Sequence, residues 1–547
     1  MKRLTTLLLS AALLLGGVSS TYAIDFKAKG YWSYSFEVAT NNKFANTNAG
    51  AANDDQFSAG ARIRLQLEAI ASEALSGTVY FEIGDIYYGM ASKKGLPNGG
   101  ALGADGSIVE LKRAYLDWGM PNTDFKVRMG IQGMSLPLFA SSGNFVLDDD
   151  AAGIVASKPI NDNLAITAFW ARLLNDNPLA ADSKFTKYLN GRTYNRDEPD
   201  NDAMDFFGLL MPMKFDGLRV TPWVGMLAMG DGVARNPGKD YDEYFVSTSR
   251  KKFQEGMGVY TGTGKAPMLQ EYGGGETYTW WGGLSAKLTK LDPILIAFDF
   301  MYGSKLGNGS AQSLTYMKDN GDVKKLPASY GGLDASRYDR KGWFASVLAE
   351  YALDWGKPGI FAWYSSGDDD NLKNGSERMP AVSGNWEYTH TGFKGTLASG
   401  AYDGLFAYQP IGLWGLALQV TDISFIKDLK NSLKILYMRG TNSADMPKKV
   451  AGSQYRLGLD VEGISPTGAI GSYLTTNDWA MEVNLDTEYK IYDNLKLVLE
   501  TAYLYVDFDK DTWSYTAPNG QNYGRLWAQR PDNPNIFKVG LNFHYSF

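Results

Sequence analysis

The chain alternates between apolar and polar residues over long stretches. From Phe26 to Phe36, every even-numbered residue is apolar, aromatic or Gly, and the residues between them are Lys, Tyr or Ser. The stretches 57–68, 125–132 and 481–486 repeat this alternation. A period of two places successive side chains on opposite faces of a strand. The pattern therefore predicts strands with one apolar and one polar face.

Strand length and the connections between strands separate this pattern from that of a soluble β-sandwich. Many of the alternating runs are about 10–13 residues long, the length that a tilted strand needs to cross a bilayer. Some connections are short, such as 120–124 and 492–494, whereas others, such as 230–276 and 367–411, are long and rich in Gly, Asn, Asp and Ser. Short turns at one end and long loops at the other are typical of outer-membrane barrels.

The alternation predicts eighteen strands, joined by eight short turns and nine long loops. They lie near 26–38, 57–69, 77–88, 107–118, 124–132, 153–158, 163–173, 203–214, 217–229, 276–289, 293–302, 341–354, 358–366, 411–422, 431–440, 478–490, 494–508 and 536–547. Without the two weakest, 153–158 and 358–366, the count is sixteen. The sequence thus predicts an all-β fold, a transmembrane antiparallel up-and-down β-barrel of eighteen strands, with sixteen as the alternative. Its short turns would be periplasmic and its long loops extracellular.

Residues 1–23 have the features of an export signal. A basic start precedes an apolar run from Leu7 to Val18, and small residues lead to Ala23. The run is too short to cross a bilayer as a helix, which needs about 20 residues. We expect cleavage after Ala23, which leaves residues 24–547 as the barrel domain of a protein of the Gram-negative outer membrane.

Composition narrows the function classes. The 547 residues include no Cys and only two His, His390 and His544, which leaves little room for thiolate metal sites or His-based catalysis. The net charge is −7, and it falls by two to −9 when Lys2 and Arg3 leave with the export signal. A negative net charge argues against a general nucleic-acid binder. We therefore expect no enzyme, no cofactor, no structural metal and no nucleic-acid partner.

The last strand carries a specific signal. Every odd position from Phe537 to Phe547 is apolar or aromatic, and every even position is polar or Gly. This ending resembles the closing strand of bacterial outer-membrane proteins. The resemblance implies that Phe543, Tyr545 and Phe547 form the signal that the barrel-assembly machinery recognises.

The whole chain from the expected cleavage site to Phe547 resembles a Gram-negative porin. Its opening, from Ile24 to Trp32, and its ending are most similar to the homotrimeric porins of sulfate-reducing proteobacteria. The resemblance implies a homotrimer with one water-filled channel per subunit, in contact with outer-membrane lipid and lipopolysaccharide. The resemblance does not identify which residues of this chain line the pore.

The third long connection, 133–152, is a candidate constriction loop. It contains an apolar stretch followed by Asp148, Asp149 and Asp150. The polar phase of neighbouring strands carries five cations: Arg62, Arg64, Arg113, Lys126 and Arg128. Charge on the lipid face costs about 2–4 kcal/mol at mid-depth, so we expect these side chains to face the lumen.

Our hypothesis is a pore constriction in which an acidic loop lies opposite a basic ladder. The transverse field between them would orient polar solutes and select them by charge. A solvated surface turn is the alternative for the three Asp residues. In another long loop, Asp368, Asp369, Asp370 and Asn371 offer oxygen ligands for a divalent ion. That group lacks EF-hand spacing, and a solvated turn is again the alternative.

The predicted function is that of an outer-membrane porin, which lets small hydrophilic solutes and ions diffuse passively. Two alternatives stay open. One is a solute-specific channel for sugars or organic acids, which saturable block by one solute would identify. The other is a structural or adhesive barrel whose long loops bind an external partner.

Overall fold

The computed structural model describes a large part of the expected barrel domain. The described residues are 24–40, 56–90, 100–102, 109–175, 203–230, 276–306, 314–317, 323–326, 339–371, 374–382, 385–393, 409–449, 451, 474–525 and 535–547. The predicted export signal, residues 1–23, lies outside them, so its cleavage after Ala23 stays a prediction. Among the described residues, no helix is both long enough and apolar enough to cross a membrane.

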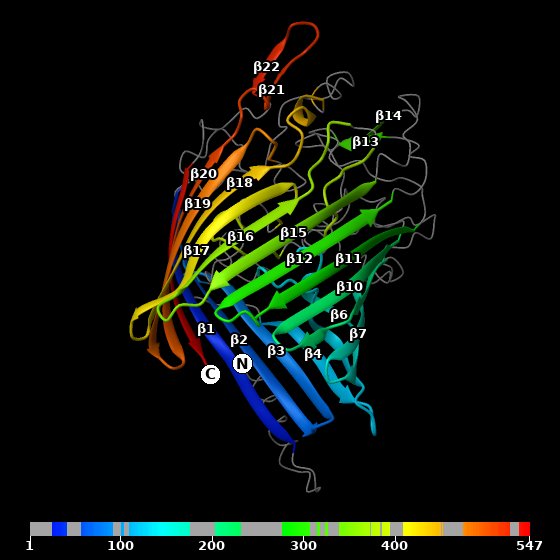
Figure 1. Ribbon diagram of the computed structural model, residues 1–547, viewed down its shortest axis with the longest axis vertical. Helices are drawn as coiled ribbons and strands as arrows, with labels where there is room; N and C mark the ends of the chain where they lie inside the picture. Colours follow the sequence, from blue (N-terminus) through cyan, green and yellow to red (C-terminus); the bar gives the residue numbers. More distant parts are fainter. Residues whose placement is uncertain are drawn as a thin grey trace.

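Nineteen strand segments form one large sheet, which Figure 1 shows curved around a central space. They are β1 (Asp25–Thr40), β2 (Gln56–Ser72), β3 (Leu75–Tyr87), β4 (Val109–Gly119), β5 (Lys126–Ser135), β6 (Asp148–Asn161), β7 (Leu164–Asn175), β8 (Ala203–Leu210), β9 (Met213–Phe215), β10 (Leu218–Met229), β11 (Thr277–Leu288), β12 (Ile294–Lys305), β15 (Arg340–Tyr351), β16 (Lys357–Ser365), β17 (Leu413–Ile426), β18 (Leu429–Gly440), β19 (Trp479–Tyr492), β20 (Leu495–Asp507) and β23 (Asn535–Ser546).

The sheet closes on itself, because β1 pairs antiparallel with β2 on one side and with β23 on the other. Segments β8 and β9 both lie between β7 and β10, so they are two parts of one strand and the barrel has eighteen strands. This confirms the predicted count, including the two weakest strands, which correspond to β6 and β16.

Two strands differ from the prediction for local reasons. The predicted strand 203–214 is interrupted after Leu210, because Pro212 has no N–H to donate to a neighbour. The predicted strand 153–158 is the longer β6, which already begins at Asp148. The polar run at its start hides the alternation that identifies the rest of the strand.

Short turns gather at one end of the barrel and long connections at the other. Two long connections contain small hairpins, formed by β13 (Leu314–Met317) with β14 (Val323–Leu326) and by β21 (Ser514–Thr516) with β22 (Asn522–Arg525). Both hairpins lie beyond the upper end of the barrel in Figure 1. At the short-turn end, Gly30 and Phe547 exchange backbone hydrogen bonds of 3.0 and 3.1 Å, which join the last residue to the first strand.

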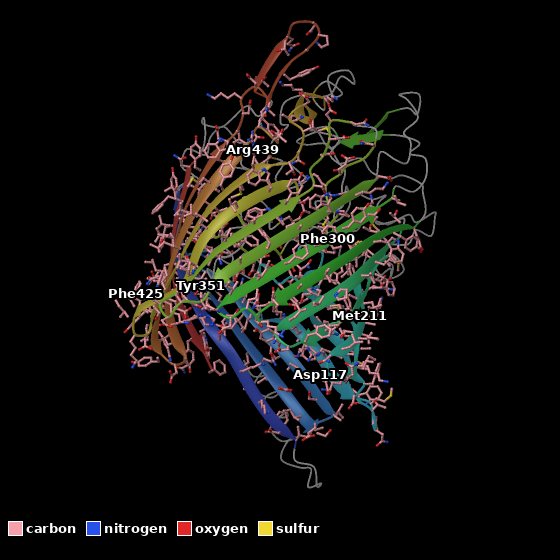
Figure 2. The ribbon with its side chains drawn as sticks, in the orientation of Figure 1. Asp117, Met211, Phe300, Tyr351, Phe425 and Arg439 are labelled. Carbon is pink, nitrogen blue, oxygen red and sulfur yellow. The ribbon has the colours of Figure 1, made fainter. Side chains whose placement is uncertain are left out.

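The outer wall exposes large apolar side chains on most of its strands. Phe300 on β12 and Tyr351 on β15 are examples (Figure 2), and Phe425 near the short-turn end of β17 is 75% exposed. A continuous apolar surface of this extent would be unfavourable in water but suits the hydrocarbon of a bilayer.

The inner wall has two different halves. From β7 to β18 many inward side chains are apolar and buried, among them Phe169, Phe206, Trp281, Phe344 and Phe361. From β1 to β5 the inward side chains are mostly polar or charged, and several are partly exposed. The apolar half departs from the expected polar inner phase because two segments of the chain fold inward and pack against it.

Candidate functional site: a narrowed barrel lumen

The first inward segment leaves the wall through a change of strand pairing. Strand β5 pairs with β4 only as far as Ile131, opposite Ala114, whereas it pairs with β6 up to Ser135, opposite Asp148. The upper part of the β5–β6 hairpin is therefore free of β4 and carries residues 136–147 into the barrel. We call residues 136–147 the inward loop; they lie within the predicted constriction loop 133–152.

The inward loop crosses to the far wall. The carboxylate of Asp299 on β12 accepts hydrogen bonds of 2.8 Å from the backbone N–H groups of Phe139 and Ala140. On β11, the hydroxyl of Ser285 donates to the carbonyl oxygen of Pro137 at 3.2 Å. Phe145 on the same loop is fully buried. The loop is thus fixed by two neighbouring strands more than a hundred residues away in the sequence.

A second inward segment, residues 385–393 of the β16–β17 connection, lies in contact with the inward loop. The indole N–H of Trp386 donates to the hydroxyl of Ser141 at 2.8 Å, and the backbone N–H of Glu387 donates to the carbonyl oxygen of Ser142 at 2.9 Å. The two backbones approach closely at Gly143, whose φ is +71°. A Cβ at this position would lie 1.6 Å from the carbonyl oxygen of Asn385, so only Gly fits.

Aromatic side chains fix the second inward segment to the apolar half of the wall. The ring of Trp386 lies 5.1 Å from that of Trp363 and 4.5 Å from that of Phe393, and the rings of Phe361 and Tyr388 are 4.4 Å apart. Buried aromatic side chains contribute large apolar areas to a core. Sequence reasoning missed this segment, although three aromatic residues within nine positions of a polar loop are a signal that could have found it.

The predicted basic ladder lies on the opposite, polar half of the wall, and its four Arg side chains are ion-paired. The pairs are Arg62–Asp85 at 2.7 Å, Arg64–Glu82 at 2.5 Å, Arg113–Asp150 at 2.6 Å and Arg128–Asp117 at 2.7 Å. Figure 2 marks Asp117 on β4. The fifth predicted cation, Lys126, is exposed at the short-turn end of β5.

Tyrosine rings support three of these guanidinium groups. Their central carbons lie 5.6 Å from the ring centre of Tyr31 for Arg64, 5.7 Å from Tyr80 for Arg113 and 4.2 Å from Tyr115 for Arg128. These distances are within the range of cation–π attraction. The ladder is therefore a set of oriented groups, each restrained by a carboxylate and most also by a ring.

A sixth cation joins the ladder through a β-bulge in β4. Opposite Tyr80 and Phe81 on β3 stand Arg113 and Leu111, so Lys112 is the extra residue of the bulge. Its ammonium group lies 3.0 Å from Asp150 and 3.8 Å from Glu82. Sequence reasoning missed Lys112 because strict alternation places adjacent residues on opposite faces of a strand.

The three predicted acids lie at the start of β6 rather than in a surface turn, and they have separate roles. Asp150 contacts Arg113 and Lys112 directly, so it belongs to the ladder. Asp148 accepts a 3.3 Å hydrogen bond from the backbone N–H of Asn144 within the inward loop. Asp149 is exposed and accepts a 2.8 Å bond from the N–H of Asp150.

The ladder presents its cations toward the open part of the lumen. In each of the four pairs the cation is more exposed than the acid; the largest difference is between Arg113 at 38% and Asp150 at 14%. The four pairs together with Lys112 contain five cations and four acids. The side of the lumen that the inward segments leave uncovered thus carries guanidinium edges.

The acidic group of the β16–β17 connection is only partly solvated: Asp369 and Asn371 are exposed, whereas Asp368 is not. Asp368 is buried, and carboxylate oxygens of Asp368, Asp369 and Glu377 lie within 4.8 Å of one another. Burial raises the pKa of Asp368 to about 8, against the opposing effect of the Arg378 charge. The amide of Asn374 donates to Asp369 at 3.0 Å and to Glu377 at 2.9 Å, so these two acids already share a donor.

Comparisons with known proteins found solved structures of low similarity to this chain. No protein-family model matches the chain, and a search of curated proteins found no match either. OpdQ of Pseudomonas aeruginosa is 11% identical, over 96% of this chain and 98% of that one, with a TM-score of 0.44. The outer membrane channel DcaP of Acinetobacter baumannii is 9% identical, over 97% and 99%, with a TM-score of 0.39. An anion-selective porin from Comamonas acidovorans is 8% identical, over 96% and 100%, with a TM-score of 0.36. Likenesses of this strength assign no solute or assembly to the chain.

Proposed function

We propose that the chain is an outer-membrane porin through which small hydrophilic solutes and ions diffuse passively. The observation that carries the proposal is the contrast between the two faces of one closed barrel. The outer wall is apolar, whereas the inner wall from β1 to β5 carries partly exposed charges beside the inward segments. A charged inner wall that is left uncovered suits an aqueous path through the barrel.

The ladder gives this path a charge preference. Guanidinium groups that are more exposed than the carboxylates they pair with favour anions beside this wall. We therefore propose that Arg62, Arg64, Arg113 and Arg128, with Asp150 and Lys112, form the constriction. This revises the expected geometry, because Asp150 stands in contact with the cations rather than across the lumen from them.

A solute-specific channel is the second candidate, and the inward segments favour it. They pack against the apolar half of the inner wall, so a solute would pass beside the paired Arg and Tyr side chains of the other half. Arg offers two parallel N–H groups to a carboxylate, so an organic acid is the solute that such a wall would bind.

Localisation and assembly complete the proposal. The predicted export signal would send the chain across the inner membrane, and the closing strand β23 with the Phe547 that follows it supports recognition by the barrel-assembly machinery. A homotrimer embedded in outer-membrane lipid and lipopolysaccharide follows from the resemblance to porins.

The test is the zero-current potential of the purified protein in a planar bilayer under a KCl gradient. We expect open channels with an anion-selective potential, and we expect Arg64→Gln to weaken that selectivity. Lys290→Gln is the matched control, because it removes one cation at an exposed turn where Lys290 is 63% exposed. Saturable block by one organic acid would establish the specific channel. Absence of conductance would refute the porin and favour the adhesive barrel.

A further inference from the structure

The second inward segment rests on β19 through hydrogen bonds to one carboxylate. Glu482 accepts from the hydroxyl of Thr389 at 2.7 Å, from the backbone N–H of Thr391 at 3.0 Å and from that of Gly392 at 2.9 Å. All four residues are buried. Hydrogen bonds from backbone N–H groups to an ionised carboxylate are about twice as strong as neutral ones, so these bonds fix the position of the segment. We call Glu482 and the charged groups around it the seat of the second inward segment.

His390 lies at the centre of this seat, between two further carboxylates. Its Nε2 atom is 2.8 Å from Asp486 on β19, and its Nδ1 atom is 4.0 Å from Glu500 on β20. Only Nε2 is within hydrogen-bond distance of a carboxylate; Nδ1 makes no hydrogen bond and faces Glu500 at 4.0 Å. Negative charges on two sides of the ring favour its protonated, positively charged form.

The other charged groups around His390 come from β1, β18, β19 and β23. Lys434 on β18 donates to the carbonyl oxygen of Tyr388 at 2.8 Å. Lys538 on β23 donates to that of His390 at 3.4 Å and lies 3.2 Å from Glu37 on β1. With Glu482, Asp486 and Glu500, the seat holds four carboxylates and two ammonium groups. Acidic groups therefore outnumber ammonium groups around the ring, and protonation of His390 reduces the difference by one.

We propose that His390 is a pH-dependent latch: its protonated ring holds the second inward segment against the wall, and loss of the proton releases the segment and widens the passage. The consequence for transport rests on the proposed channel function. The docking of the segment itself does not, so the two can be tested apart.

The direction of the pH dependence follows from the surroundings of the ring. Burial alone would lower the pKa of His390, but the hydrogen bond to Asp486 and the charges of Glu500 and Asp486 outweigh it and raise the pKa above 6.5. A raised pKa means that the docked segment holds its proton more tightly than the released one. The latch is therefore fully effective below the pKa of the released form and is lost as the pH rises through that of the docked form. Between these two pKa values of His390, the docking constant falls about tenfold per pH unit.

Hydrogen exchange of the full-length protein in detergent tests the docking. The backbone N–H groups of His390, Thr391 and Gly392 report directly, because their acceptors belong to β19. We expect their protection, corrected for the intrinsic exchange rate, to fall between about pH 6 and about pH 9. In His390→Gln the protection should be low at both pH values. Protection that does not change with pH, or that changes equally in His390→Gln, would overturn the latch.

His544→Gln is the matched control, because it removes the other imidazole of the chain from β23. We expect its segment to retain the pH dependence of the unmodified protein; if it loses that dependence, the titrating group is not His390. Single-channel conductance over the same pH range then tests the consequence, and we expect larger steps at high pH. A pH-dependent segment in a protein without conductance would refute the porin and retain the latch.

Discussion

The carboxylate of Asp299 attaches the inward loop to the far wall, so Asp299→Ala should release the tip of the loop. The substitution removes two hydrogen bonds of 2.8 Å from the backbone N–H groups of Phe139 and Ala140, and one of 3.2 Å from the hydroxyl of Ser346. A hydrogen bond to a charged group contributes about 1.5–3 kcal/mol. The released N–H groups can reach water, so we take the low end for the two short bonds, about 3 kcal/mol in total. That corresponds to a decrease of about 100-fold in the docking constant of the loop tip.

Hydrogen exchange at Phe139 and Ala140 measures this release, and planar-bilayer recordings show whether the passage widens and its current becomes noisier. Ser346→Ala is the control, because it removes only the 3.2 Å bond and should change the docking constant less than tenfold, or by about 1 kcal/mol. Asp299→Asn keeps one acceptor oxygen and should lie between the two. Protection at both amides that survives Asp299→Ala would show that apolar packing alone holds the loop, and the reasoning would be refuted.

Two further substitutions test the ladder and the aromatic cluster. Asp150→Asn leaves Lys112 and Arg113 without their shared carboxylate, so the zero-current potential should become more anion-selective; an unchanged potential would remove Asp150 from the constriction. Trp386→Ala removes a fully buried side chain, which should destabilise the docked second segment by about 3–5 kcal/mol and raise both its hydrogen exchange and the conductance. The matched control is Trp280→Ala on the outer wall, where Trp280 is 56% exposed, and an equal effect of both would refute the packing argument.

The barrel could be predicted because its strands obey a local rule. Alternation at a period of two depends only on which face of each strand meets lipid, and that information is present in every strand by itself. The rule failed where a residue altered the backbone, as at Pro212, or where the polar run from Asp148 to Asp150 left no apolar phase to recognise.

The site was less predictable because its geometry depends on register and on contacts between distant segments. Alternation predicts that the Arg side chains face the lumen. Their pairing with Glu82 and Asp85 can be predicted only when the register of β2 against β3 is known. The position of Lys112 on the lumen side depends on the bulge in β4. The attachment of the inward loop at Asp299 needs a contact across about 160 residues, which no pattern within one segment shows.

The apolar half of the inner wall and the inward segments depend on each other. Side chains such as Phe344 and Trp363 would be exposed to water in an empty barrel of eighteen strands, and Phe145 and Trp386 would be exposed on a loop that stayed outside. Together they form a close-packed core, and such cores resist gradual deformation. The width of the passage is therefore set mainly by whether each segment is docked. It follows that the contacts that dock the segments, such as those of Asp299, His390 and Trp386, are places where one substitution or one proton can change this width.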